Sequence, residues 1–265
     1  MSDHAGMRLS AILVLLCLPL AAPVSGQGVL DGVDLASPRM TQAEMTRDEV
    51  AAVLAAGSPA DLSGKRLNGL DLSGFDFTGA NLRAASMNGC NLSGARLDGA
   101  DIGQVWMYRA NLSAASLKGA KMFQTQLWEA NLAGADMTGA HAAAIFTGAD
   151  LTGAVFRGAD LSADLRNQSM GLMRGVLRSA VADGADFSGA SLGHTDLSFA
   201  KLRGAIFREA DLASADLGGA DMTGADVTGA DFTKADLTST RMLDLQGATA
   251  NQFDQSVNLD RAIRN

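Results

Sequence analysis

The stretch ANLAGADMTGA, residues 130–140, decides the fold because it holds two consecutive copies of one five-residue unit. Each copy has a small residue first, Asp or Asn second, a large apolar residue third and glycine fifth. The large residue, the centre of the unit, recurs every fifth position from Leu62 to Met242 with two exceptions. A period of five matches neither a helix nor a strand. It predicts a chain that turns a corner every fifth residue.

Four such sides would close a square coil of about twenty residues, with the centre and the residue two before it facing inward. Glycine two after the centre suits a tight corner with positive φ. Asp or Asn before the centre can bond the backbone near that corner. Burying four large side chains contributes roughly 6–12 kcal/mol, whereas ordering twenty residues costs roughly 20–40 kcal/mol. A single coil is therefore unstable, and we expect the coils to stack.

The units ADLSG, ANLSG, ANLAG and ADMTG resemble those of the pentapeptide-repeat family, and the resemblance covers about 60–244. It implies an all-β solenoid, a right-handed quadrilateral β-helix, with the handedness taken from the family.

The first 26 residues are typical of a secretory signal peptide. Arg8 precedes the apolar run LSAILVLLCLPLAAP, and the small residues VSGQG follow it. A charge, a short apolar run and a small-residue exit favour cleavage near Gly26. Because the run is short for a membrane span, we expect a periplasmic or secreted protein without a stable span, the alternative being a retained anchor. Cleavage would remove Cys17, leaving Cys90 without a disulfide partner, as a small filler in the interior.

The regions flanking the repeat are predicted to be caps. In residues 27–59, TRDEVAAVLAAG predicts a helix with a capping box from Thr46 to Glu49 and a stop at Gly57. We expect this helix to plug the first coil, the alternative being that it binds a partner. Residues 245–265 lack the repeat and are expected to cap the other end.

The repeat slips twice. The step from Ala142 to Phe146 is one residue short, and after Leu161 the next predicted centre is Leu172. We interpret 162–171 as a bulge that replaces one regular side, and the sequence leaves open whether it is functional or a tolerated accident.

The outward positions of the second side hold the chain's tryptophans and its tyrosine, at Trp106, Tyr108 and Trp128. We expect Tyr108 and Trp128 to stack one coil apart, with Phe123 on the adjoining side and Arg166 in the bulge. Outward aromatics near arginine are typical of a protein interface. The alternative is a stacked ladder that stiffens the coils and binds nothing. Arg109 and Glu129 replace corner glycines on this side and are predicted to pair.

Six successive units carry Asp before the centre, at Asp211, Asp216, Asp221, Asp226, Asp231 and Asp236. The simplest interpretation is hydrogen bonding to the local backbone and solubility. Duplex mimicry is a second one, because the resemblance implies relatives that resemble DNA, bind gyrase and protect against quinolones in the cytosol. The predicted export signal argues against that role. Asn91, Asn111 and Asn131 share one column and predict an amide ladder.

No catalytic, cofactor-binding or metal-binding residues are predicted, since His141 and His194 lie far apart and no nucleophile or phosphate-binding motif occurs. A net charge of −8 argues against nucleic-acid binding. The leading hypothesis is a non-enzymatic exported rod that presents a protein-interaction surface. Its partner would be an unidentified protein or a second copy, and no small-molecule substrate is expected. The alternatives are a cytosolic gyrase-binding DNA mimic and a purely structural envelope protein.

Overall fold

The computed structural model describes residues 30, 33–57, 59–165 and 173–265. The chain divides into two units, Met1–Val33 and Asp34–Asn265, and the second, which is compact, contains the repeat.

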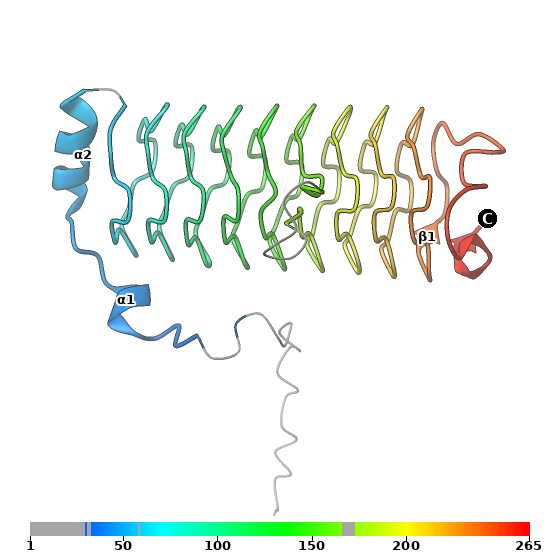
Figure 1. Ribbon diagram of the computed structural model, residues 1–265, viewed down its shortest axis with the longest axis horizontal. Coiled ribbons are helices and arrows are strands. Elements are labelled where there is room, and N and C mark those ends of the chain that lie inside the picture. Colours follow the sequence, from blue (N-terminus) through cyan, green and yellow to red (C-terminus); the bar gives the residue numbers. More distant parts are fainter. Residues whose placement is uncertain (1–29, 31–32, 58, 166–172) are drawn as a thin grey trace, which may run out of the picture. The chain divides into compact units, whose positions relative to one another are not determined.

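This second unit is a stack of coils joined by parallel backbone pairing (Figure 1). Residue 61 pairs with 81, and 81 with 101, so a regular coil has 20 residues, and the corners divide it into four sides. The N–H of each centre donates to the next coil, as Leu62 does to the carbonyl of Asn81 over 2.8 Å. The predicted coil is therefore present.

Four columns of buried centres define the sides, which we name A to D. Side A has the centres Leu62, Leu82, Ile102, Met122, Ala142, Leu161, Leu192, Leu212 and Phe232. Side B has Leu67, Met87, Met107, Leu127, Phe146, Leu177, Leu197, Leu217 and Leu237. Side C has Leu72, Leu92, Leu112, Leu132, Leu151, Ala182, Leu202, Met222 and Met242. Side D has Phe77, Leu97, Leu117, Met137, Phe156, Phe187, Phe207 and Val227.

The interior is filled by these centres and by the small residues two positions before them. Alanine fills most of the small positions and is almost completely buried. On side D, Phe187 stacks between Phe156 and Phe207, with ring centroids 4.9 Å and 5.1 Å away. Cys90 occupies a small position, and it is more than the expected filler, because its thiol donates to the carbonyl of Leu67 over 2.9 Å. Burial raises the pKa of Cys90 to about 12.

At the regular corners, the residue two after the centre has positive φ whether or not it is glycine, and the exceptions are Ala144 and Ala163 at the two slips. The angle is 66° at Gly64, 60° at Gln104 and 59° at Phe199. The prediction of a left-handed corner is confirmed. A bulky residue such as Phe199 is strained there in a way that glycine is not.

The carboxylates before the centres bond their own turn, as predicted. In all six of the successive units, the Asp Oδ1 accepts the backbone N–H two residues later. At Asp226 the hydrogen bond from the Thr228 side chain, followed by its backbone N–H and by Arg208, lowers the pKa against the opposing effect of burial. In the predicted amide ladder, Asn111 donates to Asn91 over 3.1 Å.

Two helices precede the first coil. α2 (Arg47–Ala55) has the predicted capping box between Thr46 and Glu49, and its Val50 is fully buried in the core. α1 (Pro38–Thr41) was not expected from the sequence. At the other end, β1 (Arg241–Met242) pairs in parallel with β2 (Ile263–Arg264), which follows the 3-10 helix η2 (Leu259–Arg261). In the described part of the chain, no helix is long and apolar enough to cross a bilayer.

Both slips affect side A. At the first, the N–H of Ala144 donates to the carbonyl of Ala142 over 2.7 Å, which closes a corner that is one residue short. At the second, Ile145 pairs with Val176, where an undisturbed coil would present Leu165. The chain therefore makes a detour between side A and side B and replaces no side. Leu172, the predicted next centre, lies outside the described residues, and Leu177 is the next centre that the structure shows.

Candidate functional site

The outward aromatic residues of side B form one cluster, called the aromatic surface below and consisting of Trp106, Tyr108 and Trp128. The rings of Trp106 and Trp128 meet edge to face, with centroids 5.5 Å apart. The ring contact that the structure records for Trp128 is with Trp106, so the expected stacking of Tyr108 on Trp128 stays a prediction. Trp128 is only 6% exposed, whereas Trp106 and Tyr108 are half-buried. Trp128 therefore forms the base of the cluster, and the other two rings reach solvent.

An ion pair borders the aromatic surface. The Arg109 Nε lies 2.7 Å from the Glu129 Oε2, so the predicted pairing is confirmed. The Arg109 guanidinium also lies over the Tyr108 ring, 4.9 Å from its centroid. Burial, and next the negative charge of Glu129, raise the pKa of Tyr108. Tyr108 thus remains a neutral hydrogen-bonding group at physiological pH.

An asparagine column explains how Trp106 can stand where most units have Asp or Asn. The local Asp normally accepts the N–H two residues later, but Trp106 offers no acceptor. Instead Asn88, in the preceding coil, accepts the N–H of Tyr108 over 3.0 Å. In the same way, the Asn68 Oδ1 accepts the N–H of Asn88 over 2.9 Å. The residue before the centre, here Trp106, therefore need not accept the N–H two residues later.

The same asparagines hold a segment of the chain against side B. The Asn68 amide donates to the carbonyls of Arg39 and Gln42, both over 3.1 Å. The Asn88 amide donates to the carbonyl of Met40 over 3.3 Å. α1 thus covers the two coils that immediately precede Tyr108 and Trp128 in this column.

The other two predicted binding residues lie elsewhere. Phe123 is on side A, as expected, and is 42% exposed. Arg166 lies outside the described residues.

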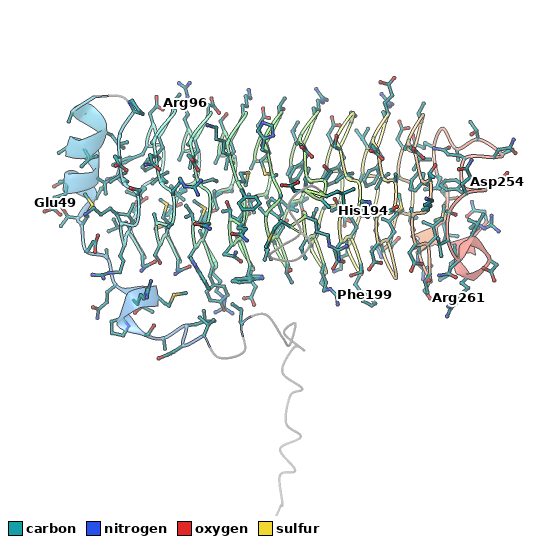
Figure 2. All side chains as sticks on the ribbon, in the orientation of Figure 1. Glu49, Arg96, His194, Phe199, Asp254 and Arg261 are labelled. Carbon is teal, nitrogen blue, oxygen red and sulfur yellow. The ribbon has the colours of Figure 1, made fainter. Side chains whose placement is uncertain are left out.

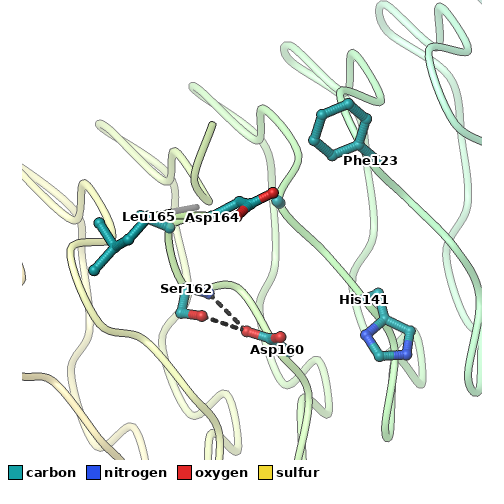
Figure 3. A pocket seen from close by; sticks show the side chains of 8 residues that line it. Phe123, His141, Asp160, Ser162, Asp164 and Leu165 are labelled. Atoms are coloured by element: carbon teal, nitrogen blue, oxygen red, sulfur yellow. Dashed lines mark hydrogen bonds between the residues drawn. The ribbon is translucent and has the colours of Figure 1, made fainter. Parts of the chain in front are cut away.

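Phe123 lines a pocket of about 440 Å³ on side A, which Figure 3 shows. The described residues that line it are Phe123, His141, Ala143, Asp160, Ser162, Ala163, Asp164 and Leu165. The Asp160 Oδ1 accepts the backbone N–H of Ser162 over 3.0 Å and its hydroxyl over 2.6 Å. The pocket was not predicted from the sequence, although the signal was present, since both slips fall on neighbouring coils of one side.

Side chains project outward from every coil, as Figure 2 shows. Ion pairs between coils offset much of the acidic charge. A cation directly after a centre reaches the Asp before the next centre of the same side. Arg203 pairs with Asp221 over 2.8 Å, and Arg208 pairs with Asp226 over 2.6 Å. Among the described residues, no group of three or more His, Cys, Asp and Glu side chains could hold a metal ion.

The repeats match the family described as pentapeptide repeats, in eight copies within 66–104, 76–113, 110–141, 142–167, 176–208 and 205–242. The chain belongs to the pentapeptide-repeat family. Membership implies a right-handed β-helix solenoid, in agreement with the stacked four-sided coils.

Solved structures of several pentapeptide-repeat proteins are similar to this one. HetL of the cyanobacterium Nostoc sp. strain PCC 7120, involved in heterocyst differentiation regulation, is 29% identical over 83% of this chain and 94% of its own, with a TM-score of 0.42. The plasmid-mediated fluoroquinolone resistance protein QnrB1 is 21% identical over 76% of this chain and 91% of its own, with a TM-score of 0.30. A thylakoid-lumen protein of Arabidopsis thaliana is 24% identical over 63% and 68%, with a TM-score of 0.21. No curated protein sequence matches the chain.

Proposed function

We propose that this pentapeptide-repeat protein is an exported, non-catalytic scaffold that binds a protein partner through the aromatic surface of side B. The observation that carries the proposal is the position of α1. Side B already holds a peptide segment of its own chain on Asn68 and Asn88, and the aromatic surface continues that column. A partner segment placed there would follow the path that α1 begins.

The composition of the surface supports this role. Tryptophan, tyrosine and arginine dominate the binding energy of protein interfaces. Trp106 and Tyr108 are half-buried, so a partner can cover what remains exposed, and Trp128 packs against Trp106. Arg109 and Glu129 provide a polar rim.

A stiffening ladder is the competing role, and the burial of Trp128 against Trp106 favours it. Substituting serine at Trp106 and Tyr108 separates the two roles, followed by crosslinking and capture of partners from the native compartment. Phe199→Ser is the matched control, since it removes a 62% exposed aromatic ring from another part of side B. The binding proposal expects loss of the captured protein in the double variant alone. Unchanged capture by the double variant would contradict it.

Export rests on residues 1–26, whose charge, apolar run and small-residue exit resemble a secretory signal. We place the mature protein in the periplasm or outside the cell. N-terminal sequencing after cell fractionation tests this placement. Recovery of the chain from the cytosol with Met1 intact would overturn it and would favour the gyrase-binding alternative.

The caps are the remaining part of the proposal. Val50 of α2 is fully buried in the core of the coils, which supports a role for 27–59 in covering the first coil. The pairing of β2 with β1 supports the same role for 245–265 at the last coil. Covered ends would protect the terminal backbone from pairing with other chains.

A further inference from the structure

We propose that α1 is a displaceable segment that competes with the protein partner for the asparagine column of side B. The inference rests on the proposed function in taking side B as the surface that binds the partner. It adds that α1 leaves Asn68 and Asn88 before a partner segment uses the whole column. In the absence of the partner, the protein's own chain therefore covers part of the site.

α1 is held on side B by a few hydrogen bonds, whereas α2 is packed into the core. The amides of Asn68 and Asn88 donate to three carbonyls of residues 39–42. None of the four residues of α1 is buried, while Val50 of α2 is completely buried. Segments with few buried apolar contacts open at a lower free energy than the core of the same protein. We therefore expect α1 to open locally while α2 and the coils stay folded.

The chain directly after α1 is anchored to the first coil. Ala43 pairs with Leu67 in an antiparallel bridge, and the Glu44 N–H donates to the carbonyl of Arg66 over 2.8 Å. The Glu44 carboxylate also lies 3.2 Å from the Arg66 guanidinium. These contacts limit the opening to the residues before Ala43, and they keep α1 tethered beside side B when it is open.

Asn88 links α1 to the aromatic surface. Its Nδ2 donates to the carbonyl of Met40 over 3.3 Å, while its Oδ1 accepts the N–H of Tyr108 over 3.0 Å. When α1 leaves, the bond to Tyr108 still orients the side chain, and Nδ2 is free for another carbonyl. Asn68 and Asn88 then offer donors about 4.8 Å apart, one coil from the next. Main-chain carbonyls of a partner segment are the groups that fit these donors, because α1 itself is held through such carbonyls.

A tethered segment competes strongly even when its contacts are few. Its effective concentration at side B is on the order of millimolar, as for other short intramolecular connections. A free segment with only the contacts of α1 must exceed that concentration to replace it. A partner that also covers Trp106 and Tyr108 gains further contacts, and these allow it to displace α1.

The probe for the test is a synthetic peptide with the sequence of residues 34–44, and the side-chain amide NMR signals of Asn68 and Asn88 report its binding. The peptide is added to the unchanged protein and to a variant in which a Gly-Ser sequence of the same length replaces residues 38–42. Gly and Ser have lower helix propensity than most residues, so this variant loosens α1 and keeps the chain joined. We expect a saturable shift in the variant and binding at least about tenfold weaker in the unchanged protein. Equal binding to both proteins, or none to the variant, would overturn the proposal.

Hydrogen exchange in the unchanged protein gives a second measurement that needs no variant. The Gln42 N–H donates to the carbonyl of Pro38 in α1, and the Val50 N–H donates to the carbonyl of Thr46 in α2. We expect the Gln42 amide to exchange at least about tenfold faster than the Val50 amide, because α1 opens alone. Exchange of Gln42 as slow as that of Val50 would show that α1 stays docked and would contradict the proposal.

A matched pair of substitutions in the Gly-Ser variant assigns the peptide to side B. Asn68→Asp removes the amide donor and keeps the acceptor for the Asn88 N–H, whereas Asn131→Asp makes the same change on side C. We expect the first to abolish the shift of the Asn88 signal and the second to leave it unchanged. Equal effects would contradict binding at the asparagine column. Since no step alters Trp106 or Tyr108, failure here is distinct from failure of the proposed function, which partner capture tests.

Discussion

Side B before Ala142 and side B after Gly175 share one backbone pattern but satisfy it with different side chains. On the later part of side B, Asp before the centre accepts the N–H of its own turn, as Asp216 does for Gly218. On side B of the earlier coils, Asn88 serves the following coil instead. An acceptor from the preceding coil, called a borrowed acceptor below, takes over the hydrogen bond that Asp would otherwise accept. The residue before the centre then need not be Asp or Asn, and in this protein it is Trp106.

The largest expected effect concerns the packing of side D, where Phe187 of the later coils stacks between two other phenylalanines, whereas leucine stands at position 97 of the earlier coils. We expect Phe187→Ala to lower the free energy of unfolding by about 3–5 kcal/mol, because the ring lies between two others. Leu97→Ala, the matched change in the earlier coils, should cost about 2–4 kcal/mol. Denaturant unfolding measures both. A larger loss for Leu97→Ala would show that the stacked rings add nothing.

The borrowed acceptor gives the next effect. Asn88→Ala removes the acceptor for Tyr108 and the donor to Met40, and Asn88 is only 7% exposed. We expect a loss of about 1–3 kcal/mol and faster hydrogen exchange in α1. Asn131→Ala is the control, because the exposed Asn131 serves its own turn at Ala133, and it should cost less than about 1 kcal/mol. Equal losses of unfolding free energy in the two variants would show that an acceptor from the preceding coil matters no more than a local one.

Cys90 allows a comparison within the interior, since Thr195 and Thr240 occupy equivalent positions in the later coils and donate to carbonyls in the same way. Cys90→Thr should therefore change stability by less than about 1.5 kcal/mol. Because the pKa of Cys90 is raised to about 12, the unfolded thiol ionises first. Its contribution to stability is full below about pH 9 and falls as the pH rises toward 12. Thiol labelling of the folded protein at pH 8 should be slow, and rapid labelling would contradict the burial.

The smallest effect concerns the ion pairs of the later coils. Arg208→Gln should lower stability by less than about 1 kcal/mol, since Arg208 is largely exposed. The lowered pKa of Asp226 means that its contribution is full above its ordinary value and is lost as the pH falls through the folded one. The difference between the two proteins should therefore shrink below about pH 4 and in high salt. Unfolding measured across pH and salt checks both, and a difference that persists in acid would point to lost packing.

The repeat predicts the coil well because the inward positions obey one rule at every side. The same rule predicts the positive φ of the corners and the turn bonds of Asp, and the capping box identifies α2. The contact of Trp106 with Trp128 was not predictable, because outward side chains choose among several neighbours. Nor was α1, which is held by Asn68 and Asn88 rather than by a local pattern. The two slips are visible in the sequence and signal an irregularity of side A, although its shape depends on the folded coils.

The detour after Leu161 adds residues to the chain without changing the pairing of the coils. Asp164 and Met173 close its base with a backbone hydrogen bond, and Gly175 returns to donate to the carbonyl of Leu161. The coils on both sides pair as though nothing had been inserted between them. This corner is therefore a natural place to graft a foreign loop or a small folded module, displayed at a fixed point on an otherwise regular surface.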